Sequence, residues 1–376
     1  MKILIMGGTG AMGKEIVALL AKNRENCVKV TSRQKFDSNE NITYLQGNAM
    51  EMGFIEPLLK NEKFDVVVDF MLYSVMQFRE RYELLLQSCK QYIFFSSARV
   101  YAASDMPVME ESPRLLDVTT DMEYLKDEEY SLTKAKEEDI LKSSNYQNYV
   151  IIRPYKTYND NRLQLGVFEK EQWFHRAVLG KTVVVPGSIE DLHTSLTSAK
   201  DNAKVLHRII GDMSLNGEVI QIANPERITW GEVIQLYSSC IEKRYGRKLK
   251  VFYAKDTSEI EALFNNKYRI KYDGLVDRVF DDSKIKSLMG EEFSWTPVSV
   301  GLIECVNHGI EQYEEETSPI KNLRMKNYSI EGLYDKLAGE YISVFAIPGI
   351  KNRLKYLIYH TIDAETIRKI KQLISR

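Results

Sequence analysis

Cysteine and histidine are scarce in this sequence of 376 residues, and their scarcity limits the chemistry that the chain can carry. The four cysteines, Cys27, Cys89, Cys240 and Cys305, lie far apart and form no Cys-x-x-Cys pair. We therefore expect neither a disulfide framework nor a structural zinc site. The five histidines are also scattered, so we expect no metal centre.

Long apolar runs and an excess of charge are missing as well. No stretch of about 18 apolar residues occurs, so we expect no insertion into a membrane. The formal net charge is −2, whereas proteins that bind nucleic acid usually carry a basic patch. Glycine interrupts the apolar start after Met6, which is not the pattern of a signal peptide. We expect a cytoplasmic protein that binds no nucleic acid.

The N-terminus contains the clearest motif. An apolar run, MKILIM, leads into a glycine-rich turn at 7–13, and apolar residues at helical spacing follow. This order predicts a buried strand, a tight turn and an amphipathic helix. Glycines at 7, 10 and 13 would let the backbone approach a pyrophosphate at the helix N-terminus. The alternative is a strand–turn–helix unit without a ligand. The predicted dinucleotide contacts are Gly7, Thr9, Gly10, Ala11, Met12 and Gly13.

The end of the next expected strand, Cys27–Thr31, bears on the choice of dinucleotide. In such folds an acidic residue after this strand binds the 2′-hydroxyl of NAD. This chain has Ser32 and Arg33 there, and a guanidinium suits a 2′-phosphate. We therefore favour NADP(H) over NAD(H), and the alternative explanation is that Arg33 is simply solvated.

Strands and helices alternate along most of the chain. This alternation predicts an α/β protein with a Rossmann-type, doubly wound parallel sheet. We expect a dinucleotide-binding domain at 1–154, to whose sheet later segments can return. A smaller α/β substrate-binding region at 155–316 and a helical C-terminal extension at 317–376 would follow. The expected strands are 1–6, 27–31, 42–46, 64–70, 92–96, 150–153, 183–185 and 218–222. The expected helices include 51–62, 74–90, 130–143, 167–179, 199–211, 330–345 and 363–374.

Tyr130 and Lys134 are four residues apart on an expected helix, so their side chains share one face. A nearby ammonium favours the phenolate and makes a tyrosine useful as an acid or base near neutral pH. Alone, such a pair is most often a surface pair. Here Ser97 follows the strand at 92–96, at the sheet edge where open α/β sheets bind ligands. Together, Ser97, Tyr130 and Lys134 predict a hydride-transfer site beside a nicotinamide.

Four motifs, in this order, resemble the extended short-chain dehydrogenases/reductases. That family includes the NAD(P)-dependent sugar-nucleotide epimerases, dehydratases and 4-keto reductases, and the resemblance covers about residues 1–316. The motifs are Gly7-x-x-Gly10-x-x-Gly13, FFSSARVY at 94–101, Tyr130-Ser-Leu-Thr-Lys134 and Ile151-Ile152-Arg153-Pro154.

The resemblance implies Ser97, Tyr130 and Lys134 as the catalytic triad. Asn48 would face adenine, and Tyr130, Lys134 and Pro154 would contact the cofactor. It further implies 4-keto reduction or 4-epimerisation of a nucleotide sugar, a role in polysaccharide biosynthesis and a homodimer. The residues expected to contact the substrate are Ser97, Ala98, Tyr130, Lys156 and His193.

Three segments depart from the family pattern and leave the sugar open. The loop after Pro154 reads Tyr155-Lys156-Thr157-Tyr158-Asn159-Asp160, and 191–195 lacks the arginine that many relatives have. The segment 317–376 has no counterpart in compact members. Ala98-Arg99 stands where the dehydratases have Asp-Glu, which argues against dehydration. The alternative to an enzyme is a non-catalytic relative that uses the fold as a binding or regulatory module, with RNA as a candidate partner.

Overall fold

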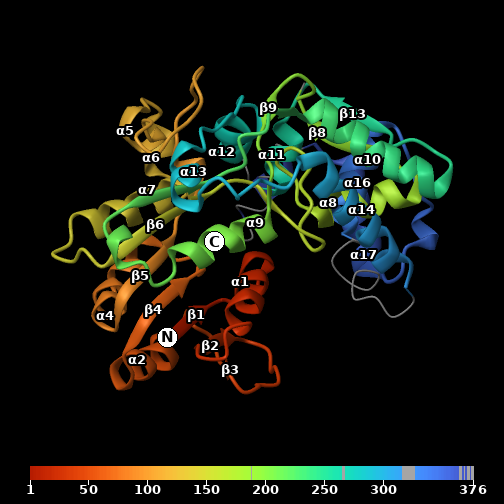
Figure 1. The fold of residues 1–376 in the computed structure, drawn as a ribbon. Coiled ribbons are helices and arrows are strands. Elements are labelled where there is room, and N and C mark those ends of the chain that lie inside the picture. The colour runs from red at the N-terminus through yellow and green to blue at the C-terminus, as the bar shows by residue number, and fades with distance from the viewer. Residues whose placement is uncertain are drawn as a thin grey trace. The chain divides into compact units, whose positions relative to one another are not determined.

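A parallel sheet forms the centre of the N-terminal part of the molecule (Figure 1). The computed structural model describes residues 1–187, 189–264, 267–315 and 327–363, together with 366, 367, 369, 370 and 373. Within these residues the sheet has seven strands in the order β11-β6-β5-β4-β1-β2-β3, and every pair is parallel. The strands are β1 (Lys2–Met6), β2 (Cys27–Ser32), β3 (Ile42–Gln46), β4 (Phe64–Asp69), β5 (Cys89–Phe95), β6 (Tyr149–Pro154) and β11 (Val219–Ile222).

Helices cover both faces of this sheet. Successive residues of a strand point to opposite faces, so Ile3 and Ile5 pack with α1 (Ala11–Ala21) and α9 (Ala199–Ile209), while Leu4 and Met6 pack with α2 (Met52–Asn61) and α4 (Tyr82–Gln87). Both core clusters are fully buried, which explains why β1 reads as an unbroken apolar run. The arrangement confirms the expected Rossmann-type, doubly wound fold. The helices of this part are α1 (Ala11–Ala21), α2 (Met52–Asn61), α3 (Val75–Arg79), α4 (Tyr82–Gln87), α5 (Leu115–Val118), α6 (Met122–Lys126), α7 (Tyr130–Lys142), α9 (Ala199–Ile209) and α13 (Ser283–Met289).

The chain divides into two compact units that interleave along the sequence. The first comprises Met1–Asn159, Ser195–Glu226 and Val279–Thr296, and the second comprises Asp160–Thr194, Arg227–Arg278 and Pro297–Arg376. This division differs from the contiguous ranges 1–154, 155–316 and 317–376, because β11 returns to pair with β6. The first unit also holds the short parallel pair β7 (Thr157–Tyr158) and β10 (Thr197–Ser198).

The second unit is mainly helical, with two small pairs of strands. β8 (Val183–Pro186) pairs in parallel with β13 (Val251–Ala254), and β9 (His193–Thr194) pairs antiparallel with β12 (Ile228–Thr229). Its helices are α8 (Lys170–Leu179), α10 (Trp230–Tyr245), α11 (Ser258–Phe264), α12 (Lys267–Arg269), α14 (Val298–Glu314), α16 (Tyr328–Ala338) and α17 (Ile350–Thr361). Single turns of 3-10 helix lie at Ala98–Val100, Met213–Leu215 and Val344–Ala346, and a π-helical turn lies at Ile270–Gly274.

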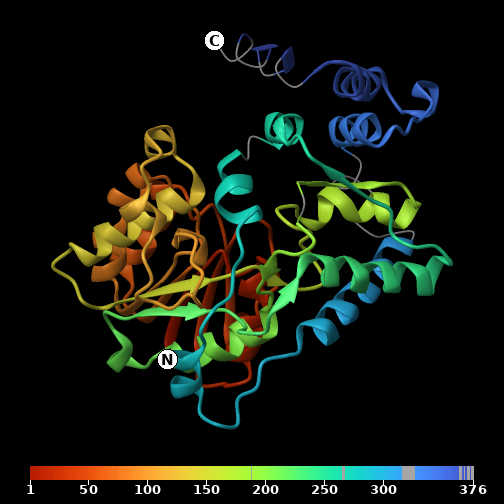
Figure 2. The same cartoon turned by 90° about the horizontal axis from the view of Figure 1, so that it is seen from above.

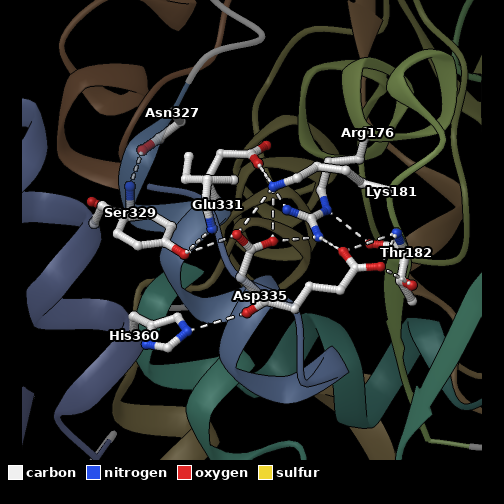
Figure 3. A network of polar contacts seen from close by, with 11 residues as sticks. Arg176, Lys181, Thr182, Asn327, Ser329, Glu331, Asp335 and His360 are labelled. Atoms are coloured by element: carbon white, nitrogen blue, oxygen red, sulfur yellow. Dashed lines mark hydrogen bonds and ion pairs between the residues drawn. The ribbon is translucent and has the colours of Figure 1, made fainter. Parts of the chain in front are cut away.

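α16 and α17 pack side by side as a helical pair (Figure 2). The two helices approach closely at Gly332, where a Cβ atom would lie 2.3 Å from the carbonyl oxygen of Tyr356. A mostly buried ionic network joins this pair to α8 and to the residues just before β8 within the second unit (Figure 3). The Arg176 guanidinium lies 2.8 Å from Glu331 Oε2 and 2.8 Å from Asp335 Oδ1, and Lys181 Nζ lies 2.9 Å from Asp335 Oδ1.

Two expected helices were wrong in their bounds. The segment expected as one helix at 74–90 forms α3 and α4, because Arg81 leaves helical geometry between them, and β5 already begins at Cys89. The helix expected at 330–345 ends at Ala338, since Gly339 adopts φ +67° and stops it. α17 was missed, and the expectation for 363–374 falls partly outside the described residues.

Candidate active site

The glycine-rich turn leaves the N-terminus of α1 open. Gly10 is the N-cap of α1 with no side-chain capping bond, and the first turn contains no acidic residue. Gly7 has φ +74°, and a Cβ atom at Gly13 would lie 2.6 Å from the backbone of Gly8. The turn therefore requires glycine for close packing, and it exposes backbone N–H groups at the positive end of a helix. Thr9, Ala11 and Met12 are part of this same turn and first helical turn. These features fit the pyrophosphate of a dinucleotide.

The ends of β2 and β3 contribute polar side chains in the same unit. Thr31 Oγ1 accepts a hydrogen bond of 3.1 Å from the Gly7 N–H, so it fixes the glycine turn. Ser32 is buried and accepts from the Gln34 N–H, whereas Arg33 is exposed. Asn48 accepts from the Met50 N–H at 3.1 Å and donates to Glu51 at 3.0 Å. These contacts hold Asn48 in the turn before α2.

The end of β5 and the start of α7 meet through Arg99. Ser97 follows β5, is 6% exposed and accepts a hydrogen bond of 3.2 Å from the Arg99 N–H. The Arg99 guanidinium lies 5.3 Å from the centre of the Tyr130 ring and also pairs with Glu129, the N-cap of α7. Tyr130 begins α7 and is half-buried. The structure therefore brings the segments that carry Ser97 and Tyr130 together.

Lys134 lies one turn after Tyr130 and is only 1% exposed. Its Nζ forms an ion pair of 2.9 Å with Glu137 Oε2 and lies 3.4 Å from the carbonyl oxygen of Met71. The ammonium is also 4.6 Å from the centre of the Phe94 ring. The lysine predicted to act beside Tyr130 thus has a buried carboxylate as its neighbour.

A second buried acid, Asp69, ends β4 near this lysine. Its carboxylate accepts hydrogen bonds from Tyr92 Oη at 2.8 Å, Tyr73 Oη at 3.1 Å and the Met71 N–H at 2.9 Å. Burial raises the pKa of Asp69 despite these bonds. Burial also raises the pKa of Glu137 to about 7, against the opposing effect of the Lys134 ammonium, and the charge of Asp69 adds to that rise.

The next residue, Glu138, is held quite differently. It accepts from Arg153 Nε at 2.8 Å, from Arg153 Nη2 at 2.6 Å and from Ser96 Oγ at 2.6 Å. Burial would raise the pKa of Glu138, but the guanidinium and the hydroxyl outweigh it and hold this pKa below its ordinary value. The bidentate pair joins α7 to β6, whose last residue is Pro154, and the Ser96 hydrogen bond joins α7 to the residue that follows β5.

The expected substrate contacts fall in both units. Ala98 is fully buried. Lys156 is 8% exposed, has φ +28° and donates to Tyr155 Oη at 2.5 Å, so it is engaged within the first unit. His193 belongs to the second unit, where its Nδ1 lies 3.1 Å from Asp277 Oδ1 and its carbonyl accepts from the Arg278 N–H.

Sequence reasoning missed Asp69 and Glu137, although both had a signal. Glu137 stands three residues after Lys134, a spacing that places two side chains on one helix face. Asp69 ends a buried strand at the carboxyl edge of a parallel sheet, where ligands bind in this class of fold. Among the residues that the structure describes, no cluster of His, Cys, Asp and Glu could hold a metal ion. None of the helices described is both long and apolar enough to cross a membrane.

Residues 3–223 match the model of the NAD dependent epimerase/dehydratase family. The chain belongs to this family. A UDP-glucuronic acid 4-epimerase from Bacillus cereus, solved in complex with NAD, has a similar fold with a TM-score of 0.62 and 17% identity, covering 84% of this chain and 100% of that one. A UDP-N-acetylglucosamine 4-epimerase from Methanobrevibacter ruminantium M1, in complex with UDP-N-acetylmuramic acid, gives a TM-score of 0.62 at 20% identity, covering 83% and 98%.

A further relative has a name that refers to nucleic-acid stem-loops and not to a sugar-nucleotide enzyme. The chain is 28% identical over 245 residues to the chloroplast stem-loop binding protein of 41 kDa b from Arabidopsis thaliana. That match covers 61% of this chain and 60% of the plant protein. The similarity to the two epimerase structures shows the fold of this chain.

Proposed function

We propose that this protein transfers a hydride to and from C4 of a nucleotide-activated sugar, as a 4-epimerase or a 4-keto reductase that uses NAD(P). The observation that carries the proposal is the placement of two groups on one sheet. The open N-terminus of α1 follows β1, and Arg99 contacts both Ser97, which follows β5, and Tyr130 at the start of α7. The carboxyl edge of an open parallel sheet is where ligands bind in such folds. Family membership supports this assignment.

Each residue would then have a defined role. The N–H groups around Gly10 to Gly13 would bind the pyrophosphate, and the bound nicotinamide would supply the hydride acceptor and donor. Ser97 would donate a hydrogen bond to the sugar oxygen, and Tyr130 would move a proton to or from that oxygen. The Lys134 ammonium would hold the ribose of the dinucleotide. Residence in the cytoplasm, dimer formation and a role in polysaccharide biosynthesis stay predictions.

Replacement of Tyr130 tests the hydride-transfer chemistry. Tyr130→Phe removes the proton carrier and should lower turnover of UDP-sugars by roughly 10²- to 10⁴-fold. Turnover would be followed by NMR of the sugar with added NAD⁺ or NADPH. Tyr82→Phe is the matched control, because that hydroxyl bonds to Glu83 on α4 and should not matter. Undiminished turnover in Tyr130→Phe would show that the mechanism is wrong.

The choice of coenzyme depends on Arg33. An exposed guanidinium at the end of β2 suits the 2′-phosphate of NADP(H), whereas the B. cereus structure contains NAD. Arg33→Ala should weaken binding of NADP⁺ far more than binding of NAD⁺, measured by calorimetric titration. Equal losses for the two coenzymes would remove the basis for preferring NADP(H).

A second candidate function comes from the plant relative. The name of that relative gives the second candidate, a module that binds stem-loops of nucleic acid. A formal net charge of −2 speaks against it, as does the presence of both Tyr130 and Lys134. Measurements of RNA binding and of sugar turnover on the wild type and Tyr130→Phe distinguish the two functions. A stem-loop binder would retain its affinity for a labelled RNA hairpin in Tyr130→Phe and would turn over no nucleotide sugar in the wild type.

A further inference from the structure

Lys134 has a buried acidic partner that its predicted role does not require. The ammonium contacts Glu137 Oε2 at 2.9 Å, and the side chains of both residues are almost completely buried. Apart from Lys134, neither carboxylate oxygen of Glu137 has a hydrogen-bond partner among the residues described. Glu137 therefore depends on one counter-ion in a place that water does not reach.

The other groups around Glu137 do not compensate its charge. Asp69 at the end of β4 is a second buried acid, and its charge opposes ionisation of Glu137. Tyr92 on β5 and Tyr73 after β4 are neutral and donate their hydrogen bonds to Asp69. One ammonium thus serves two buried carboxyl groups. A buried carboxylate that loses its counter-ion takes up a proton, because the neutral acid is the cheaper form in a medium of low polarity.

We propose that Glu137 is a proton-linked counter-ion of Lys134, so that binding of a dinucleotide is coupled to protonation of Glu137. When the Lys134 ammonium turns toward the ribose of the dinucleotide, the Glu137 carboxylate binds one proton from solvent and becomes the neutral acid. The ion pair between Lys134 and Glu137 is lost in this step, and the new O–H bond of Glu137 is the one covalent change. The proposal rests on the proposed function, since it takes Lys134 to be a dinucleotide contact.

The direction of the pH dependence follows from the two states of Glu137. Without dinucleotide, the pKa of Glu137 is about 7. Loss of the ammonium removes an interaction that lowers this pKa, so the pKa is higher in the complex. Below pH 7 both states are protonated, and affinity should not depend on pH. Above pH 7, affinity should fall by up to about tenfold per pH unit, because binding then consumes a proton.

Isothermal titration of the full chain with NAD⁺ tests this coupling. Titrations at pH 8 in two buffers of different ionisation enthalpy report the number of protons taken up per dinucleotide bound. The wild type should take up close to one proton, and Glu137→Gln should take up none and show a flat affinity between pH 6 and pH 8.5. Glu128→Gln is the control, since it removes the same charge from an exposed site next to α7 and should behave like the wild type.

A second variant guards against misfolding of Glu137→Gln. Lys134→Met removes the counter-ion from both states, so it should bind NAD⁺ more weakly and also take up no proton. Proton uptake by Glu137→Gln equal to that of the wild type would overturn the proposal while leaving the proposed function in place. Binding of neither NAD⁺ nor NADP⁺ by the wild type would overturn both. If only NADP⁺ binds, the same titrations use NADP⁺, whose 2′-phosphate itself titrates at about pH 6. The contribution of that phosphate is the same in the wild type and in Glu137→Gln, so the difference between their proton uptakes reports Glu137 alone.

Discussion

Two buried ionic clusters, one in each unit, differ in how completely their carboxylate oxygens are hydrogen-bonded. In the second unit, Arg176 contacts Glu331, Asp335 and Glu340, and Lys181 contacts the first two of these acids (Figure 3). Further donors serve the same carboxylates: Thr182 Oγ1 donates to Glu340 at 2.6 Å and Tyr356 Oη donates to Asp335 at 3.0 Å. Both carboxylate oxygens of Asp335 and of Glu340, and Oε2 of Glu331, therefore accept from at least one donor.

The cluster around Lys134 in the first unit has fewer donors. One ammonium faces Glu137 and, further off, Asp69, and Glu137 has no second donor in the described structure. The adjacent Glu138 shows that α7 can hold a fully bonded carboxylate, because Arg153 and Ser96 satisfy it. The incomplete bonding of Glu137 is thus particular to its position beside Lys134. Perturbed titratable groups tend to lie at functional sites, whereas a saturated network holds structure together.

The largest expected effect comes from breaking the saturated cluster. Arg176→Met leaves three carboxylates without their shared guanidinium and should lower the free energy of unfolding by about 3–5 kcal/mol. The measurement is urea denaturation of the full chain. Arg244→Met on α10 is the control, because the Arg244 side chain is exposed and its ion pair with Glu314 should contribute little to stability. Equal losses in the two variants would remove the distinction between the clusters.

The sequence predicted the parts of the fold that depend on local pattern. The buried strand β1, the glycine turn and α1 follow from the apolar periodicity and the glycine spacing. The end of α16 was missed because the apolar pattern continues past Gly339, where the backbone becomes left-handed. A pattern of side chains does not reveal that change of backbone.

The sequence predicted individual residues of the candidate site but not the charged groups that surround them. Ser97, Tyr130 and Lys134 could be named from motifs, and the structure places their segments on one edge of the sheet. The charge state around Lys134 could not be predicted, because it depends on β4, β5 and α7 packing together. Asp69 and Glu137 are 68 residues apart in sequence, and only the folded sheet brings both to one lysine.

The second prediction concerns the pH dependence of stability and the unsaturated cluster. The pKa of Glu137 is about 7 in the folded chain against an ordinary 4.5. The neutral Glu137 side chain therefore contributes fully to the free energy of unfolding below pH 4.5, and this contribution is lost as pH rises to about 7. The glutamine of Glu137→Gln cannot ionise, so this variant should lose no stability through that position as pH rises. Relative to the wild type it should gain up to about 3 kcal/mol over that range, since one pKa unit corresponds to about 1.36 kcal/mol. Urea denaturation at several pH values measures the difference, and a constant difference would contradict the prediction.

The smallest expected effect comes from Asp69, the second acid beside Lys134. Asp69→Asn retains an oxygen that can accept from Tyr92, so the free energy of unfolding at neutral pH should change by about 1 kcal/mol or less. Its charge is one cause of the raised pKa of Glu137, so that pKa should fall toward its ordinary value in the variant. The pH-dependent gain of Glu137→Gln should therefore be smaller in the Asp69→Asn background than in the wild type. Denaturation of the four chains of this double-mutant cycle measures the coupling directly. An unchanged gain would mean that the charge of Asp69 does not contribute to the raised pKa of Glu137.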